Sequence, residues 1–215
     1  MFSNFNLETI VLSIPAVLIA FTVHEFAHAY VAYRLGDKSQ KFQGRLTLNP
    51  FVHVDPMGFI MLLLFGFGWA KPVQVNTRAL KNYKRDDLLV SLAGCAANII
   101  TAAVFAVIIG LFYRFIFLYN NELLSIINRI MYYTMTLNIS LALFNLLPLP
   151  GLDGFRVFGH IFPKLFYKIG DFLYRYQSLI FIIIIITDII SYVLYWPMRI
   201  LSEIMYKIIN IFAGM

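Results

Sequence analysis

Long apolar stretches with almost no charge dominate this chain, and they restrict it to folds whose helices lie in a lipid bilayer. Only 13% of its 215 residues are charged and 60% are hydrophobic, whereas a soluble domain carries about 25% charged residues. The mean hydropathy is +0.77. An apolar helix needs about 20 residues to cross a bilayer. The sequence therefore predicts an all-α polytopic membrane protein with about four to six transmembrane helices, in a single domain over residues 1–215.

Several stretches are long enough to cross the membrane as helices, but one is not. Residues 57–70 have 14 residues with three glycines, so a helix there would be too short to cross. Residues 57–70 and the polar residues on either side are therefore predicted to form a short extended or re-entrant membrane-associated segment near residues 40–76. The amphipathic tail, residues 197–215, either lies on the membrane or crosses it. The predicted spans are residues 9–35, 88–118, 123–147 and 179–196, with the core of the domain at 9–160 and C-terminal membrane helices at 161–215.

Basic side chains set the predicted orientation in the membrane. The segments after the first span, before the second and after the third are rich in Lys and Arg. Cytoplasmic loops carry an excess of these residues, so all three segments are predicted to face the cytoplasm. Basic loops that face the cytoplasm and anionic lipid explain the net charge of +6. No nucleic-acid partner is therefore expected. The single cysteine, Cys95, excludes a disulfide framework and a cysteine-based metal cluster.

The first apolar stretch contains the motif HEFAH, from His24 to His28. Residues at i and i+4 lie on one face of a helix, so the two imidazoles can bind one metal ion. Glu25 is adjacent and can take a proton from a metal-activated water. Ionisable groups in an apolar helix are costly and mark functional sites. The alternative is two structural histidines that hydrogen-bond to neighbouring helices, with Glu25 as their partner.

Two histidines leave a catalytic zinc site incomplete, because such sites usually have three protein ligands and one open position. Among the remaining carboxylates, Asp153 stands out because it follows a Pro- and Gly-rich turn, residues 148–151, at the end of an apolar stretch. These residues stop a helix, which frees backbone groups to line a polar cavity. The same position also suits a helix N-cap. By itself, Asp153 therefore remains open as either ligand or cap.

Three stretches together resemble the site-2 protease family of intramembrane zinc metalloproteases, peptidase family M50, in its short prokaryotic form without a PDZ or CBS domain. HEFAH (24–28) is similar to the family's HExxH, and NLLPLPGLDGFRVF (145–158) is similar to its second signature. NPFVHVDPMG (49–58) with GFGWAKPVQVN (66–76) resembles the stretch between them. The matches occur in the family's order and cover most of residues 20–160.

The resemblance implies a zinc metalloendopeptidase that hydrolyses peptide bonds in or near transmembrane segments, as in regulated intramembrane proteolysis. It implies one Zn²⁺ per chain, bound by His24, His28 and Asp153, with Glu25 as general base. It also implies that Asn145 holds the oxyanion or the substrate. The expected partners are a transmembrane helix of a membrane-protein substrate and the lipid bilayer. The expected location is a prokaryotic cell membrane, with the active site nearer the cytoplasmic face. The substrate's identity and the oligomeric state stay open.

Other residues of interest receive weaker expectations. His53 and Asn49 either gate the site and contact substrate or, as we favour, hydrogen-bond within their own loop. His160 is expected at a surface or an interface. Asp188 interrupts an apolar stretch and is expected to mark a helix break and cap the next helix. Residues 57–70 with their flanks either hold the substrate as an added strand or simply pack on protein.

Two other functions compete with proteolysis. A membrane metal-binding or transport protein predicts carboxylates and histidines spread along a pathway, whereas here they cluster at one depth. A pseudoprotease, which binds transmembrane helices without cutting them, is expected to lack Glu25 or Asp153. Both residues are present.

Overall fold

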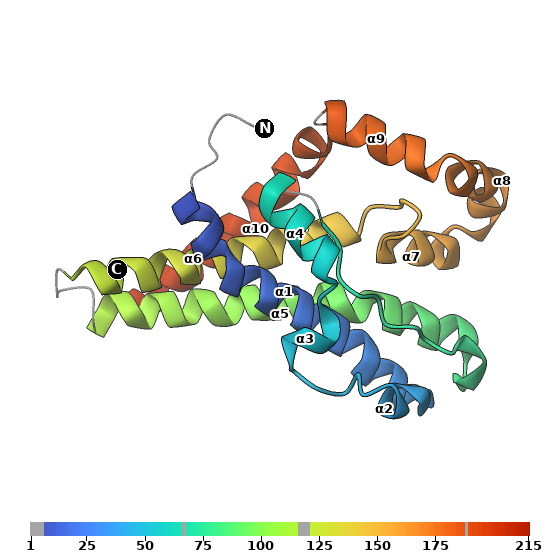
Figure 1. Cartoon of the computed structure of the whole chain (residues 1–215), viewed down its shortest axis with the longest axis horizontal. Helices are drawn as coiled ribbons and strands as arrows, with labels where there is room; N and C mark the ends of the chain where they lie inside the picture. The colour runs from blue at the N-terminus through green and yellow to red at the C-terminus, as the bar shows by residue number, and fades with distance from the viewer. Residues whose placement is uncertain (1–6, 66–67, 116–120, 188) are drawn as a thin grey trace.

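The computed structural model describes residues 7–65, 68–115, 121–187 and 189–215. Within these ranges the regular elements are helices, and one isolated β-bridge pairs Val54 with Ala70. In chain order the helices are α1 (Leu7–Leu35), α2 (Ser39–Phe42), α3 (Pro50–His53), α4 (Pro56–Phe65), the 3-10 helix η1 (Thr77–Ala79), α5 (Tyr83–Phe115), α6 (Glu122–Asn145), α7 (Asp153–Ile161), α8 (Pro163–Arg175), α9 (Gln177–Thr187) and α10 (Ile189–Ala213) (Figure 1).

Three long helices form the centre of the molecule. α5 runs antiparallel to α1 and α6, and each of the three packs against the other two (Figure 1). Small residues allow this close approach, because Ala16 and Ala20 on α1 and Ala102 on α5 are fully buried. Apolar runs of this length form helices in lipid because every backbone N–H and C=O is then paired within its own segment.

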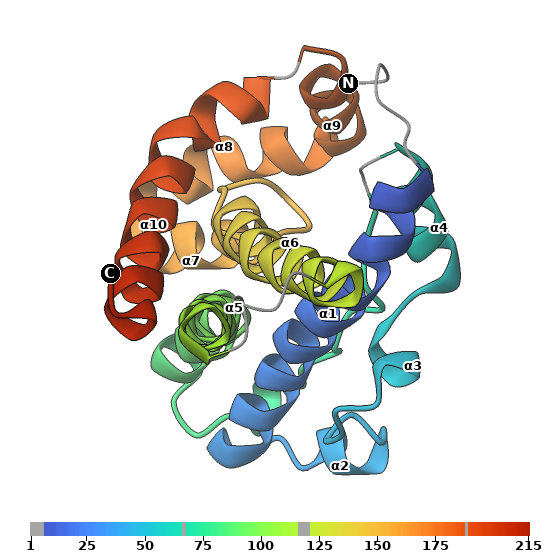
Figure 2. The ribbon, with the colours of Figure 1, turned by 90° about the vertical axis from the view of Figure 1, so that its left-hand side faces the viewer.

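α10 packs against α5 and α6 on the side away from α2, α3 and α4 (Figure 2). Gly110 of α5 permits the approach, since a Cβ at this position would lie 2.6 Å from the carbonyl oxygen of Ile209. The apolar core that results joins α5, α6 and α10, and consists of Ala102, Ala106, Ile109, Phe112, Met131, Met135, Ile139, Met205 and Ile209.

α1 ends where glycine reverses the backbone. Gly36 has φ 128°, a conformation that side chains with a Cβ rarely adopt. The N–H of Asp37 then returns to the carbonyl of Ala32 at 2.9 Å, which satisfies one of the free carbonyls at the helix end.

The region near residues 40–76 is only partly the extended or re-entrant segment that the sequence predicts. Pro56–Phe65 are not extended, because they form α4. Asp55 explains the helix, since its carboxylate accepts the N–H of Gly58 at 2.8 Å and caps the first turn. The extended part is the stretch that follows α4, where the N–H of Lys71 donates to the carbonyl of His53 at 2.8 Å.

Arg45 holds this extended stretch from one side. Its side chain is buried. Its guanidinium donates to three backbone carbonyls, which belong to Val52, Lys71 and Pro72. One side chain therefore ties the loop before α3 to the stretch after α4.

Asp37 and Gln40 hold the far end of the same stretch. Gln40 Nε2 donates to the carbonyl of Gln74 at 2.9 Å, and the Asp37 carboxylate accepts the N–H of Asn76 at 2.8 Å. Burial alone would raise the pKa of the Asp37 carboxyl group. Hydrogen bonds from Ser39, Gln40 and Asn76 outweigh burial and hold that pKa below its ordinary value.

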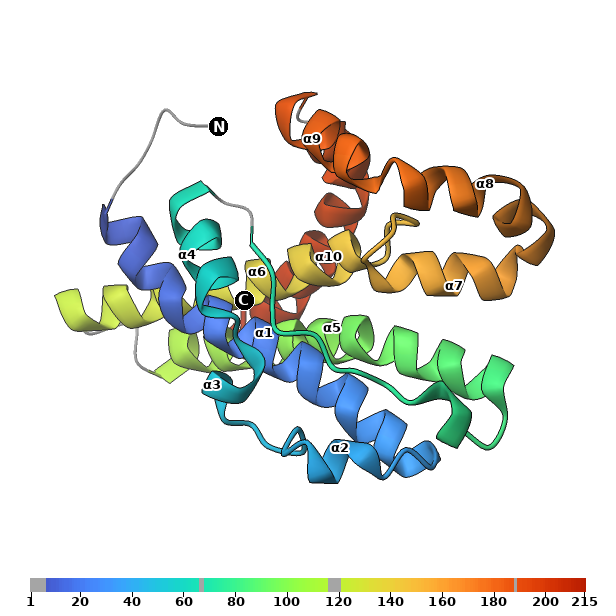
Figure 3. The ribbon, with the colours of Figure 1, turned by 45° about the vertical axis from the view of Figure 1, so that its right-hand side comes forward.

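The basic stretch after the third predicted span contains two helices, α7 and α8. These helices lie side by side at the end of the molecule where α1 ends and α5 begins (Figure 3). Aromatic side chains join them, because Phe155 and Phe158 of α7 lie with ring centroids 5.0 and 6.1 Å from Phe166 of α8. The hairpin keeps α7, and with it the first residue of α7, packed on α5.

The predicted fourth span, residues 179–196, is not one straight helix. α9 ends at Thr187 and α10 begins at Ile189, and the two helices meet at a bend of 73°. The expected helix break is therefore confirmed, whereas Asp188 itself lies outside the described residues. α10 then continues through Pro197 without a new element starting there.

Among the described residues, α1 and α5 are long and apolar enough to cross a membrane. The bent pair of α9 and α10 would add a third crossing if the two helices form one span. These helices agree with an all-α membrane protein. The predicted number of four to six spans is not confirmed.

Candidate metal centre

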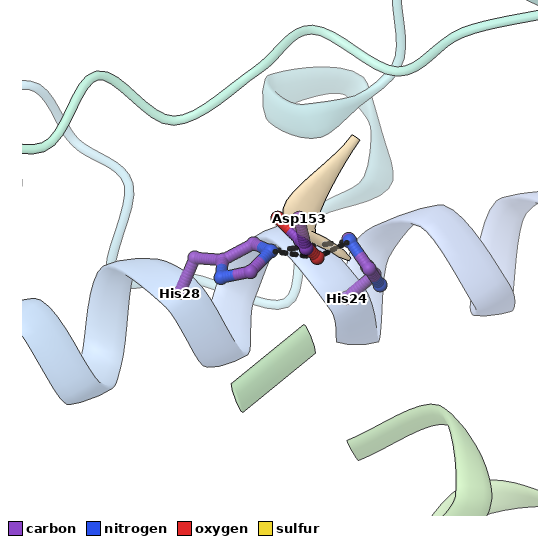
Figure 4. A group of neighbouring side chains, drawn as sticks. All are labelled: His24, His28 and Asp153. Atoms are coloured by element: carbon purple, nitrogen blue, oxygen red, sulfur yellow. Dashed lines mark hydrogen bonds and ion pairs between the residues drawn. The ribbon is translucent and has the colours of Figure 1, made fainter. Parts of the chain in front are cut away.

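Two histidines and one aspartate converge on a single point in the middle of the helix bundle. His24 and His28 project from one face of α1, one turn apart, and Asp153 reaches them from the start of α7 (Figure 4). The Nε2 atoms of His24 and His28 lie 3.1 Å apart. Each of them also lies 3.1 Å from Asp153 Oδ2. All three side chains are largely shielded from solvent.

The spacing of these three atoms fits a zinc ion. An equilateral triangle with sides of 3.1 Å has its corners about 1.8 Å from its centre, slightly less than the zinc–ligand distance of about 2.0–2.2 Å for imidazole and carboxylate. The three atoms are therefore spaced so that one zinc ion could be held by all of them. Its outer side would remain for a fourth ligand, as in catalytic sites.

The other ring nitrogens of the histidines fix the tautomer that a metal requires. His24 Nδ1 lies 2.6 Å from Asn98 Oδ1, and His28 Nδ1 lies 2.7 Å from the carbonyl oxygen of Val90. Both partners are acceptors, so each Nδ1 carries the proton and each Nε2 keeps its lone pair for the metal. The centre thus has the outer hydrogen bonds typical of metal-binding histidines.

Asn98 is itself held in place by hydrogen bonds. It is fully buried on α5. Its Nδ2 donates to the carbonyl of Ala20 at 3.1 Å and to Asn138 Oδ1 at 2.7 Å. Because the amide nitrogen is committed to these two oxygens, Oδ1 is the atom that faces His24. Asn98 therefore links α1, α5 and α6 at the level of the centre.

Gly94 of α5 makes room for the two imidazoles. A Cβ at this position would lie 2.5 Å from His28 Nε2 and 2.6 Å from His24 Cε1. Only glycine allows the α5 backbone to approach the imidazoles this closely. Neither Gly94 nor Asn98 was expected at the site from the sequence. For Asn98 the available signal was a polar side chain within an apolar span.

Asp153 is brought to the histidines by the irregular turn between α6 and α7. Gly151 has φ 91° within this turn, and α7 begins at Asp153 itself. Cys95 Sγ of α5 lies 3.8 Å from Asp153 Oδ2. The preceding residue, Leu152, occupies the N-cap position, so the capping role considered for Asp153 does not describe its place in the structure.

Glu25 lies next to the centre, 7% exposed. Its Oε2 accepts a hydrogen bond from the backbone N–H of Val73 at 2.9 Å. Val73 belongs to the extended stretch that Arg45 and Asp37 hold. The backbone of this stretch therefore orients the Glu25 carboxylate.

The remaining predicted residues make local hydrogen bonds. The Nδ2 of Asn145 donates to the carbonyl of Leu141 within α6 at 2.9 Å, so its amide is engaged with its own helix. Asn49 caps α3 by accepting the N–H of Phe51. His53 Nε2 lies 2.7 Å from the carbonyl oxygen of Thr47, which agrees with the favoured loop-bonding role.

His53 is fully buried, and its Nδ1 has no hydrogen-bond partner among the described residues. Burial lowers the pKa of His53, and the charge of Arg45 lowers it further, whereas the Thr47 carbonyl and Glu25 act in the opposite direction. The net direction is downward, so the neutral imidazole is favoured in the folded protein.

Within the described part of the chain, His24, His28 and Asp153 are the one group of three metal-binding side chains close enough to share an ion. A pathway of such groups, as a transport protein would need, is not present among these residues. The cluster and the adjacent carboxylate of Glu25 favour a single catalytic metal ion.

Comparisons with known proteins agree with this chemistry. The model of peptidase family M50 matches residues 12–187. The chain is 41% identical over 186 residues to YwhC of Bacillus subtilis, which is named as a candidate zinc metalloprotease, and the match covers 85% of this chain and 83% of YwhC. It is 33% identical to Rip2 of Mycolicibacterium smegmatis, named in the same way, over 67% of this chain and 55% of Rip2. It is 29% identical to MJ0611 of Methanocaldococcus jannaschii, also so named, over 73% of each protein. No solved structure matches the chain.

Proposed function

The chain belongs to peptidase family M50, and from this premise we propose that it is a zinc-dependent endopeptidase that cuts membrane-protein substrates within or beside their transmembrane segments. The convergence of His24 Nε2, His28 Nε2 and Asp153 Oδ2 at mutual distances of 3.1 Å carries the proposal. The group of three protein ligands among the described residues and the adjacent Glu25 support a catalytic ion over a structural one, because a structural zinc site has four protein ligands.

Zinc bound by these three side chains would supply a Lewis acid that activates water and polarises the scissile carbonyl. Glu25 takes a proton from the attacking water and returns it to the leaving amine. Asn98 and the Val90 carbonyl hold the two imidazoles in their metal-binding orientation throughout. The Val73 N–H fixes the Glu25 carboxylate beside the reacting atoms.

The extended stretch beside Glu25 is the proposed binding site for the substrate backbone. Its residues 74 and 76 are bonded to Gln40 and Asp37, whereas Val73 and Val75 alternate with them along the strand. Because Glu25 holds the Val73 N–H, a substrate on the opposite edge would pair with the Val73 carbonyl and the Val75 backbone. A substrate that pairs with this edge as an added strand must unwind locally, which frees its carbonyls from helical hydrogen bonds. The substrate would then lie directly against Glu25. Asn145 would have to leave the Leu141 carbonyl to stabilise an oxyanion.

The position of the centre supports cleavage at membrane depth. His28 lies seven residues before the end of α1, about 10 Å along the axis at 1.5 Å per residue. The basic loops at this end of α1 support a location on the cytoplasmic side of the membrane. α6, with 24 residues packed along α1 and α5, is proposed as a further crossing.

The test uses purified protein reconstituted in liposomes with a generic single-span substrate, and the products are mapped by mass. We expect cleavage within or at the cytoplasmic border of the span, abolished by a zinc chelator and restored by added zinc. Cleavage confined to soluble parts of the substrate, or cleavage that survives chelation, would reject the proposal.

A further inference from the structure

α7 delivers Asp153, and a second polar cluster on the same helix attaches α7 to α5. Asp153, Arg156 and His160 occupy positions i, i+3 and i+7, so they lie on one face of α7. That face meets α5, the long helix against which α7 packs. The metal ligand thus shares its helix face with two basic side chains.

Both basic side chains bind one buried carboxylate. Asp87 of α5 has a side chain only 3% exposed. Its Oδ1 accepts a hydrogen bond from Arg156 Nη2, and its Oδ2 lies 2.6 Å from His160 Nε2. The Tyr83 ring also meets His160 edge-on, with centroids 5.8 Å apart. His160, expected at a surface or an interface, is 15% exposed and binds Asp87 where α7 packs against α5.

The spacing along the two helices shows that this cluster and the metal centre are linked. On α5, Asp87 precedes Cys95 by eight residues, about 12 Å, and Cys95 lies beside Asp153. On α7, Asp153 precedes His160 by seven residues, about 10.5 Å. The two helices run antiparallel with Asp153 against Cys95 at one end and His160 against Asp87 at the other. A shift of α7 along α5 would break both contacts.

We propose that Asp87 is a positioning residue that fixes the register of α7, through Arg156 and His160, so that Asp153 reaches His24 and His28. This inference rests on the proposed metal ligands. A buried carboxylate between two basic groups suits the role, since removal of one partner from such a cluster leaves an uncompensated charge that cannot be tolerated in the same geometry. The imidazole pair itself does not depend on Asp87, because His24 and His28 are held by Asn98 and Val90.

The experiment measures binding of Co²⁺, which reports coordination by its visible absorption, to the detergent-purified full chain. Asp87→Ala is compared with Asp86→Ala. Asp86 is the matched control because it is buried at the same end of α5. Its carboxylate accepts the N–H of Asn82, the residue just before α5, and among the described residues it makes no hydrogen bond to α7. We expect Asp87→Ala to bind Co²⁺ about 10–100-fold more weakly, with the weaker absorption of a centre that has lost one protein ligand. Asp86→Ala should keep the wild-type spectrum.

A second comparison separates positioning from general stability. The variant with both Arg156→Ala and His160→Ala should show the same defect, and adding Asp87→Ala to it should weaken binding no further. Additive losses, or equal losses in Asp86→Ala, would show that the cluster only stabilises the fold and would overturn the inference. An unchanged Co²⁺ spectrum in Asp87→Ala would overturn it as well. Failure of the wild type to bind Co²⁺ would instead reject the ligand set, and with it both proposals.

Discussion

Gly94→Ala tests whether close approach of α5 to the imidazoles builds the metal centre. The added methyl group would lie 2.5 Å from His28 Nε2 and 2.6 Å from His24 Cε1. Ordinary contact begins near 3.4 Å, so the rings or the helix must move by roughly 0.9 Å. Metal–ligand distances tolerate deviations of only about 0.2 Å. The change therefore cannot be absorbed while His24, His28 and Asp153 all remain ligands.

We expect Gly94→Ala to lower zinc affinity by about 100-fold or more, equivalent to about 2.7 kcal/mol, and to abolish cleavage. Zinc affinity is measured by competition with a chelating dye. Gly110→Ala is the matched control, because Gly110 lies on the same helix as Gly94 but away from the centre. The added methyl group would lie 2.6 Å from the carbonyl oxygen of Ile209 on α10. Alanine favours helix over glycine by about 1 kcal/mol, so helix propensity acts equally in both variants. The reasoning is refuted if Gly94→Ala binds zinc within about threefold of wild type, or no more weakly than Gly110→Ala does.

Two further predictions address the surroundings of the centre. Asn98→Ala should weaken zinc binding about 10–100-fold by releasing His24 Nδ1, measured by the same dye competition. Asn138→Ala removes a residue that bonds to Asn98 and should have a smaller effect. Equal effects of the two substitutions would count against a role for Asn98 in orienting His24. Asp37→Asn should destabilise the protein by about 1–2 kcal/mol near neutral pH. Because the pKa of Asp37 is lowered in the folded state, its stabilising effect is present above the unfolded pKa of about 3.9 and is lost as pH falls through the folded value. Thermal unfolding curves of the two proteins should therefore converge at acid pH, and a gap that stays constant down to pH 3 would contradict this assignment.

Local patterns predicted the parts of the centre that lie on one helix. The i, i+4 spacing places His24 and His28 on one face of α1 whatever the rest of the fold does. Asp153 needed the family resemblance, because its position after a Pro-rich turn suits a cap as well as a ligand.

Side-chain contacts between residues far apart in the sequence were not predicted. Asn98 lies 74 residues from His24, and Asp87 lies 73 residues from His160, so no local period connects them. α4 was missed because its length argued against a crossing, although Asp55 and Pro56 are sound helix-start signals. The break before Ile189 was expected from the single acidic residue in an apolar run.

The most direct test of the account compares wild type with Glu25→Gln for zinc content and for cleavage of a single-span substrate in detergent. Glu25 is not one of the three converging ligands, so both proteins are expected to hold one zinc per chain. Only the wild type should cut within the substrate span, because glutamine cannot accept the proton of the attacking water. Cleavage by Glu25→Gln at the wild-type rate, or the absence of metal from both proteins, would contradict the account.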